Sequence, residues 1–344
     1  MSDSTELEVP DEEPWMSHAF ISKLATQVSF PYRRPKDGSR DITRRNGNLE
    51  VRFVSGGDAI PYGKYPRLFE LFTASMVQTG AECFDPETNT LHLGTTFREF
   101  LKMLNIQVGG RQLKTIKPQL ENLFTCTYVI RNNTETTSRG VSFVVAEKYN
   151  IDWLRNEPQE HGLFENWVQF SKGYVDKLRD SPVPVSLEAI SHLTSPMSLD
   201  VYWWLARRYS YLRDSTSIKW EQLQAQFGSD SSLKKFKQNF KRAVADVLVV
   251  YSQARIICGN HCVTLLPSET SVPTKYAKRV EEKSEASRQH SKGEVSEADI
   301  NEVIMSLGFV PEDMISVRKD ILVLLTEGRC IDAVAGIIRE KYQE

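Results

Sequence analysis

Two stretches of the sequence carry residue types that could bind a nucleotide or a metal ion. Residues 57–64 (GDAIPYGK) resemble a phosphate-binding loop, but that motif requires glycine where Asp58 stands and Ser or Thr where Tyr65 stands. Cys258, His261 and Cys262 could suggest zinc, yet a structural zinc site needs four converging ligands and no second ligand pair accompanies them. We therefore expect no nucleotide site, no metal site and no cofactor.

Catalytic patterns are also missing. The six histidines are scattered, and none forms the pair around a hydrophobic residue that metal-dependent strand-nicking initiators use with a tyrosine. Neither a G-x-S-x-G elbow nor a metalloprotease motif occurs. We expect that the protein is not an enzyme, and an enzyme that nicks or unwinds DNA is the least favoured hypothesis.

The clearest functional pattern is an amphipathic, basic helix at residues 233–251. Lys234, Lys235, Gln238 and Arg242 point away from its apolar stripe at about 100° per residue, and Lys241 flanks the stripe. A helix that reads the DNA major groove needs one buried face and one face of cations and amides. The stripe recurs at spacings of three and four and consists of Leu233, Phe236, Phe240, Ala243, Val244, Val247, Leu248 and Tyr251.

The neighbouring elements predict a helix-turn-helix with a wing. Ser195-Pro196 is a typical helix start, and a short helix at 220–227 ends at Gly228. Two strand-like segments flank Gly259-Asn260, a two-residue hairpin loop that would place Cys258 and Cys262 on opposite faces. The alternative is a merely solvated lysine face, but the order of the elements favours DNA binding. The hairpin adds two candidate DNA contacts, Arg255 and His261.

Composition and charge restrict the class of protein. At 344 residues, with 40% hydrophobic and 26% charged residues, the chain is typical of a globular protein of two or three domains. No apolar run approaches membrane-spanning length and the start is not a signal peptide, so we expect a cytoplasmic protein without a membrane partner. Five scattered cysteines fit a reducing compartment.

The net charge of -2 is the sum of unevenly distributed acidic and basic residues. Residues 1–15 are acidic, whereas residues 31–52 are basic and are predicted to form a loop or arm that lies along phosphates. The alternative is a solvated basic loop. Phosphate attraction acts within about 10 Å, so a near-neutral total does not exclude it. The candidate contacts of the arm are Arg33, Arg34, Arg44 and Arg45.

Three helices followed by a hairpin are predicted twice, at 65–147 and 186–266, which indicates a two-fold repeat of the winged-helix plan. In the first copy the third helix would expose Lys114, Thr115, Pro118 and Asn122, with Arg111 at its start. Pro118 would kink or restart this helix, because proline removes a backbone hydrogen bond. The first copy is therefore expected to position the protein, pair subunits or contact phosphates.

We expect an α+β chain of tandem winged-helix domains with a small C-terminal all-helical domain. The predicted segments are an acidic tail with a short helix around 16–27 (1–28), the first winged-helix domain with the arm (29–150), a packed connection (151–185), the second winged-helix domain (186–267), a flexible linker (268–295) and a helical interaction domain (296–344).

Several segments taken together resemble the plasmid-encoded RepA replication initiators. They are RRNGNL at 44–49, IPYGKYPRL at 60–68, GGR at 109–111, LTSPMSLDVY at 193–202 and IKWEQLQAQFG at 218–228. The resemblance covers roughly residues 29–267 in family order. Pro118 and the extension at 296–344 depart from it.

The resemblance implies a protein that binds repeated double-stranded DNA at a plasmid origin, helps to open the duplex and recruits the host initiator and helicase machinery. It also implies control of copy number, autorepression and a possible homodimer. DNA contact would fall on 233–242 and on the wing at 254–266. The alternative function is a winged-helix transcriptional regulator or autorepressor.

Overall fold

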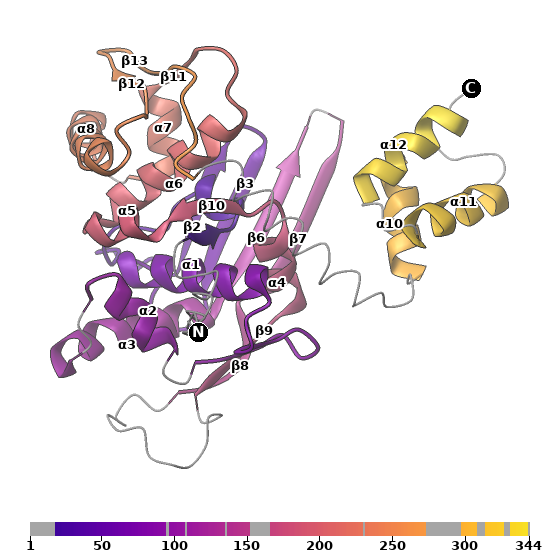
Figure 1. Cartoon of the computed structure of the whole chain (residues 1–344), viewed down its shortest axis with the longest axis horizontal. Helices are drawn as coiled ribbons and strands as arrows, with labels where there is room; N and C mark the ends of the chain where they lie inside the picture. The colour runs from indigo at the N-terminus through magenta and orange to yellow at the C-terminus, as the bar shows by residue number, and fades with distance from the viewer. Residues whose placement is uncertain are drawn as a thin grey trace, which may run out of the picture. The chain divides into compact units, whose positions relative to one another are not determined.

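The computed structural model describes residues 18–93, 96–106, 109–134, 136–151, 166–229, 231–272, 297–307, 314–326 and 331–342. The chain forms two compact units, Met1–Val280 and Glu281–Glu344 (Figure 1). The predicted acidic tail and residues 273–295 of the linker predicted at 268–295 lie outside the described residues. The predicted α+β class is confirmed, since helices and several small antiparallel sheets alternate along the first unit.

The first repeat is built around helix α1 (Lys64–Thr79), which is almost entirely buried and ends at Gly80 with φ 63°. Helices α2 (Thr96–Met103) and α3 (Gly110–Phe124) follow it. A four-stranded antiparallel sheet has the order β4-β5-β9-β8. Its strands are β4 (Phe84–Asp85), β5 (Thr90–His92), β8 (Ala146–Asn150) and β9 (Trp167–Phe170).

The second predicted repeat, residues 186–266, also combines helices with a small antiparallel sheet. Helix α4 (Lys172–Arg179) and strand β10 (Val183–Ser186) precede α5 (Leu187–His192) and α6 (Pro196–Tyr211). Strand β11 (Thr216–Lys219), α7 (Trp220–Phe227) and α8 (Leu233–Val250) come next. Strands β12 (Ile256–Cys258) and β13 (Cys262–Leu265) complete a sheet in the order β11-β13-β12. In both repeats, therefore, an early strand pairs with the second strand of a later antiparallel pair, β5 with β9 and β11 with β13.

The hairpin predicted to close the first repeat lies in a different sheet. Strands β6 (Cys126–Asn133) and β7 (Ser138–Val144) form a hairpin, but β6 pairs with β3 (Leu49–Ser55), which pairs with β2 (Asp41–Asn46). The prediction that this hairpin is the wing of the first repeat was wrong. Alternating apolar residues predict a strand but do not show which strand it pairs with. The pair that occupies the corresponding place is β8 and β9.

The prediction of a short helix around 16–27 was also wrong. Residues His18–Ile21 form strand β1, which pairs antiparallel with β10, and only Leu24–Thr26 form a 3₁₀ turn, η1. The backbone N–H of Phe20 donates to Ser75 Oγ in α1 at 2.9 Å. The start of the described chain is thus tied to both repeats.

The second unit contains α10 (Glu297–Leu307), α11 (Met314–Thr326) and α12 (Ile331–Tyr342), in agreement with the predicted small helical domain. Its core includes Val303, Ile321 and Ile338. Asp320 accepts hydrogen bonds from Lys341 Nζ at 2.6 Å and Tyr342 Oη at 2.7 Å, which fasten α12 to α11. None of the helices that could be described is long and apolar enough to cross a membrane.

Candidate nucleic-acid interface

Helix α8 separates its two faces as its sequence predicts. Ser232 caps the helix by accepting from the backbone N–H of Lys235 at 3.4 Å. The ring of Phe240 is buried 5.3 Å from the Phe227 ring of α7 and 6.0 Å from the Trp204 ring of α6, centroid to centroid. The opposite face is exposed and carries Lys234, Lys235, Gln238 and Arg242, and Lys241 at the edge of the apolar stripe is also exposed. An anchored helix therefore presents four cations and an amide to solvent.

The β12–β13 hairpin is fastened to the same helix. Lys237 Nζ donates to the carbonyl oxygen of Asn260 at 2.9 Å and lies 5.5 Å from the centroid of the Trp220 ring. Trp220 Nε1 donates to the carbonyl oxygen of Gly259 at 3.1 Å. These bonds fix the direction of the hairpin relative to α8. No sequence pattern indicated this role for Lys237, because the contact joins residues 23 positions apart.

The turn of this hairpin is shifted from the predicted position. The N–H of Gly259 donates to the carbonyl oxygen of Cys262 at 3.0 Å and Cys258 faces Val263, so the two central residues are Asn260 and His261. His261 is exposed at the tip. Arg255 is exposed just before β12, and its backbone N–H donates to Ser268 Oγ at 2.9 Å.

Metal ligation finds no support at this hairpin or elsewhere in the described parts of the chain, where no three His, Cys, Asp or Glu residues converge. Burial raises the pKa of the Cys258 thiol, although nearby Lys241 opposes that shift.

The arm and α8, which are about 200 positions apart in sequence, line one groove. Arg33, Arg34 and Lys36 are exposed on the arm, and we call them the arm cations. Lys235 and Arg242 face the same groove from α8. The start of α6 and the turn between α7 and α8 complete it, through Ser195, Pro196, Met197, Gly228, Ser229 and Ser231. Two separate sequence predictions thus converge on one surface.

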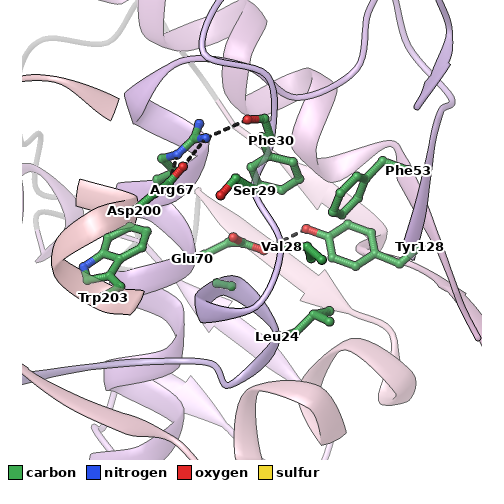
Figure 2. A pocket seen from close by; sticks show the side chains of 11 residues that line it. Leu24, Val28, Ser29, Phe30, Phe53, Arg67, Glu70, Tyr128, Asp200 and Trp203 are labelled. Atoms are coloured by element: carbon green, nitrogen blue, oxygen red, sulfur yellow. Dashed lines mark hydrogen bonds and ion pairs between the residues drawn. The ribbon is translucent and has the colours of Figure 1, made fainter. Parts of the chain in front are cut away.

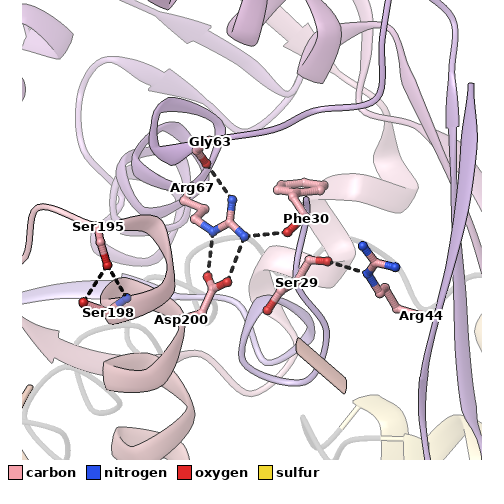
Figure 3. Close-up of polar contacts among 8 residues, drawn as sticks. All are labelled: Ser29, Phe30, Arg44, Gly63, Arg67, Ser195, Ser198 and Asp200. Carbon is pink, nitrogen blue, oxygen red and sulfur yellow. Dashed lines mark hydrogen bonds and ion pairs between the residues drawn. The ribbon is translucent and has the colours of Figure 1, made fainter. Parts of the chain in front are cut away.

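Arg44 and Arg45 do not belong to this groove. Residues from Asp41 onward form β2, so the predicted arm ends earlier than expected. Arg44 is only 5% exposed, and its Nε donates to the carbonyl oxygen of Ser29 at 3.1 Å (Figure 3). It packs against Gly228, where a Cβ atom would lie 1.8 Å from Arg44 Nε. The prediction that Arg44 contacts phosphates was wrong, because its side chain is buried and bonds to the backbone of Ser29. Arg45 is exposed and is paired with Glu50, with Nη2 to Oε2 at 2.8 Å.

Helix α3 of the first repeat exposes fewer residues that could contact DNA than α8 does. Lys114 and Thr115 are exposed, as predicted, and Pro118 lies within a helix that runs without a break from Gly110 to Phe124. Asn122 is buried instead of exposed, because its Oδ1 accepts from the backbone N–H of Ala59 at 3.1 Å. The side chain of Arg111 lies outside the described residues.

A buried polar network lies between the two repeats. Arg67 of α1 forms a two-pronged ion pair with Asp200 of α6, with Nε to Oδ1 at 2.7 Å and Nη2 to Oδ2 at 2.8 Å. One turn further along α1, Glu70 accepts a hydrogen bond from Tyr128 Oη at 2.7 Å. Figure 2 shows these groups around a small cavity that is also lined by Ser29 and Trp203. Burial raises the pKa of Glu70 to about 7, against the opposing effects of Tyr128 and Arg67.

The central part of the chain is similar to a known protein family. Residues 60–222 match the family model described as plasmid encoded RepA protein. This region is similar to that family. The resemblance to RepA that the sequence motifs suggested is therefore confirmed over these residues, which run from just before α1 of the first repeat into α7 of the second.

Two solved structures match the chain with TM-scores below 0.5, and no curated protein matches it. One is a crystal structure of selenomethionine derivatives of domains 2 and 3 of RctB, at 12% identity and TM-score 0.47, which covers 77% of this chain and 100% of that chain. The other is a crystal structure of RctB domains 2–3, at 8% identity and TM-score 0.41, which covers 71% of this chain and 96% of that one.

Proposed function

We propose that this chain is a plasmid replication initiator that binds repeated double-stranded DNA at its origin. The observation that carries the proposal is α8, whose apolar face is anchored in the core while its cations and amide lie exposed beside a fastened hairpin. In this proposal, α6, β11, α7, α8 and the β12–β13 hairpin act as a winged-helix unit, and the first repeat is a second unit of the same plan.

Helix α8 would enter the major groove. Gln238 is suited to the N6 and N7 atoms of adenine, and Arg242 to the O6 and N7 atoms of guanine. Lys234, Lys235, Lys241, Arg255 and His261 would contact phosphates, together with Arg33, Arg34, Arg45, Lys114 and Arg111. These contacts position the protein without specifying sequence. The proposal includes no catalytic step and no cofactor. The family assignment supports recruitment of host replication proteins and a homodimeric form, for which we assign no residues.

Gln238→Ala and Arg242→Ala test the role of α8. Each is expected to weaken specific binding by about 1–3 kcal/mol and to relax preference at one base position. Arg139→Ala is a matched control, because Arg139 is exposed on β7 in another sheet. Binding would be measured by footprinting and anisotropy on the plasmid DNA that flanks the gene.

The same experiment separates the possible functions. Protection of several direct repeats, with maintenance of a plasmid that lacks the gene when the protein is supplied in trans, is expected for an initiator. Protection of one inverted repeat over a promoter, without maintenance, would instead indicate a transcriptional regulator. Affinity that does not change between low and physiological salt would rule out both, because phosphate contacts release counterions.

A further inference from the structure

In the structure the arm comprises residues 30–37, because β2 shortens the predicted basic segment, and it begins at a fixed point on the first repeat. The carbonyl oxygen of Phe30 accepts a hydrogen bond from Arg67 Nη2 at 2.7 Å, and that of Pro31 accepts from the N–H of Gly63 at 3.1 Å. The ring centroid of Tyr32 lies 5.1 Å from Arg67 Cζ. Arg67 therefore holds Phe30 and Tyr32, and Gly63 holds Pro31 between them. The first two arm cations follow immediately.

Arg67 is in turn held by the second repeat. Its side chain is 2% exposed and that of its partner Asp200 is 3% exposed. Asp200 lies on α6, about one turn after Ser195 and Pro196, which line the groove, and α6 packs against α8. Figure 3 shows Arg67 at the centre of these bonds, with Asp200 on one side and Phe30 on the other. The ion pair thus joins the arm to the helices that carry the predicted DNA-reading face.

The charge of the groove fits a phosphate backbone. Five cations line it, namely the arm cations together with Lys235 and Arg242, against two carboxylates, Asp37 and Asp246. Both carboxylates already accept hydrogen bonds, Asp37 from the N–H of Ser39 at 3.1 Å and Asp246 from Ser198 Oγ at 2.8 Å. A strand of phosphates beside α8 would meet cations from both walls.

We propose that Arg67 and Asp200 are positioning residues for DNA binding. They hold the arm as the second wall of the groove, so that the arm cations contact the phosphates of one strand while α8 occupies the adjacent major groove. This inference rests on the proposed function. A buried ion pair adds little net stability compared with apolar residues of similar volume. Stability alone therefore does not account for this pair, whereas a positioning role does.

The test is a mutant cycle that combines the ion pair with the arm. Arg33→Ala/Arg34→Ala/Lys36→Ala removes the arm cations, and Asp200→Asn weakens the pair. Affinity of the full chain for a fluorescent, mixed-sequence 30-base-pair duplex is measured from about 50 to 200 mM salt. If all three arm cations contact phosphates, the log–log salt slope falls by up to about 2.7 in the arm variant, which equals roughly a 40-fold change in relative affinity across that range.

Asp200→Asn is expected to reproduce part of this loss of slope in the wild-type arm and to cause no further loss when the arm cations are absent. An equal, additive loss in both backgrounds, or a wild-type slope in Asp200→Asn, would overturn the proposal. Arg67→Met/Asp200→Leu gives the same test with apolar replacements if the single variant does not fold. Arg131→Ala/Arg139→Ala/Lys172→Ala removes three exposed cations from other elements and controls for net charge.

The outcomes separate this inference from the proposed function. If the wild-type chain binds neither this duplex nor the plasmid DNA that flanks the gene, the proposed function itself fails. If it binds and the arm variant keeps the wild-type slope, α8 remains the DNA-reading element and only the role of the arm is excluded.

Discussion

Replacing Glu70 by glutamine should change how the stability of the protein depends on pH. Glu70 is 5% exposed and accepts a hydrogen bond from Tyr128 Oη at 2.7 Å. Burial raises its pKa from 4.5 to about 7. Glutamine has nearly the same shape and can accept the same hydrogen bond, but it cannot ionise.

The sign of the effect follows from the two pKa values. Below pH 4.5 the carboxyl is protonated in the folded and unfolded chains alike. Between pH 4.5 and about 7 the unfolded chain releases its proton while the folded chain keeps it, so the free energy of unfolding falls as pH rises. A difference of about 2.5 pKa units corresponds to roughly 3 kcal/mol, most of which is lost between pH 5 and 8.

Urea unfolding at pH 5 and pH 8 provides the measurement. The wild-type chain is expected to lose about 2–3 kcal/mol more than Glu70→Gln over this range, and the variant should be the more stable protein at pH 8. Glu82→Gln is the control, because Glu82 is exposed. Parallel pH profiles for wild type and Glu70→Gln would refute the assignment of a buried carboxyl with a raised pKa.

Two further substitutions examine the hairpin and the turn of the DNA-binding half. Lys237→Met removes the hydrogen bond to the Asn260 carbonyl, and we expect faster amide exchange at residues 259–262 and a loss of duplex affinity of about 1 kcal/mol. Gly228→Ala places a side chain at φ +61° against the buried Arg44, whereas Gly47→Ala meets open space at φ +60°. Denaturation should show that Gly228→Ala costs at least about 1 kcal/mol more than Gly47→Ala, and equal costs would exclude the packing of Arg44 on that turn.

Local patterns in the sequence predicted the parts of the fold that depend on neighbouring residues. The period of α8 and the serine and glycine signals at the ends of α6, α7 and α8 were sufficient to assign these helices. They also predicted which side chains of α8 are exposed, because an amphipathic helix of five turns has only one face that a core can accept.

Pairings between distant segments were not predictable in the same way. Strand β1 finds its partner β10 about 165 positions away, and β6 joins β3 instead of closing the first repeat. Arg44 has the same sequence context as its exposed neighbour Arg45, and only the pairing of β2 with β3 decides which of the two faces inward. The convergence of the arm and α8 on one groove also depends on such distant contacts.

The bond between Arg67 and Asp200 has a consequence for the order of events during synthesis. The two residues are 133 positions apart, so Arg67 lacks the carboxylate that pairs with both sides of its guanidinium until the ribosome has completed α6. A chain interrupted before that point would leave the two hydrogen bonds of Arg67 to Asp200 unmade in a buried site, which is unfavourable. The first repeat should therefore reach its final packing only when the second emerges, and the two should unfold together as one cooperative unit.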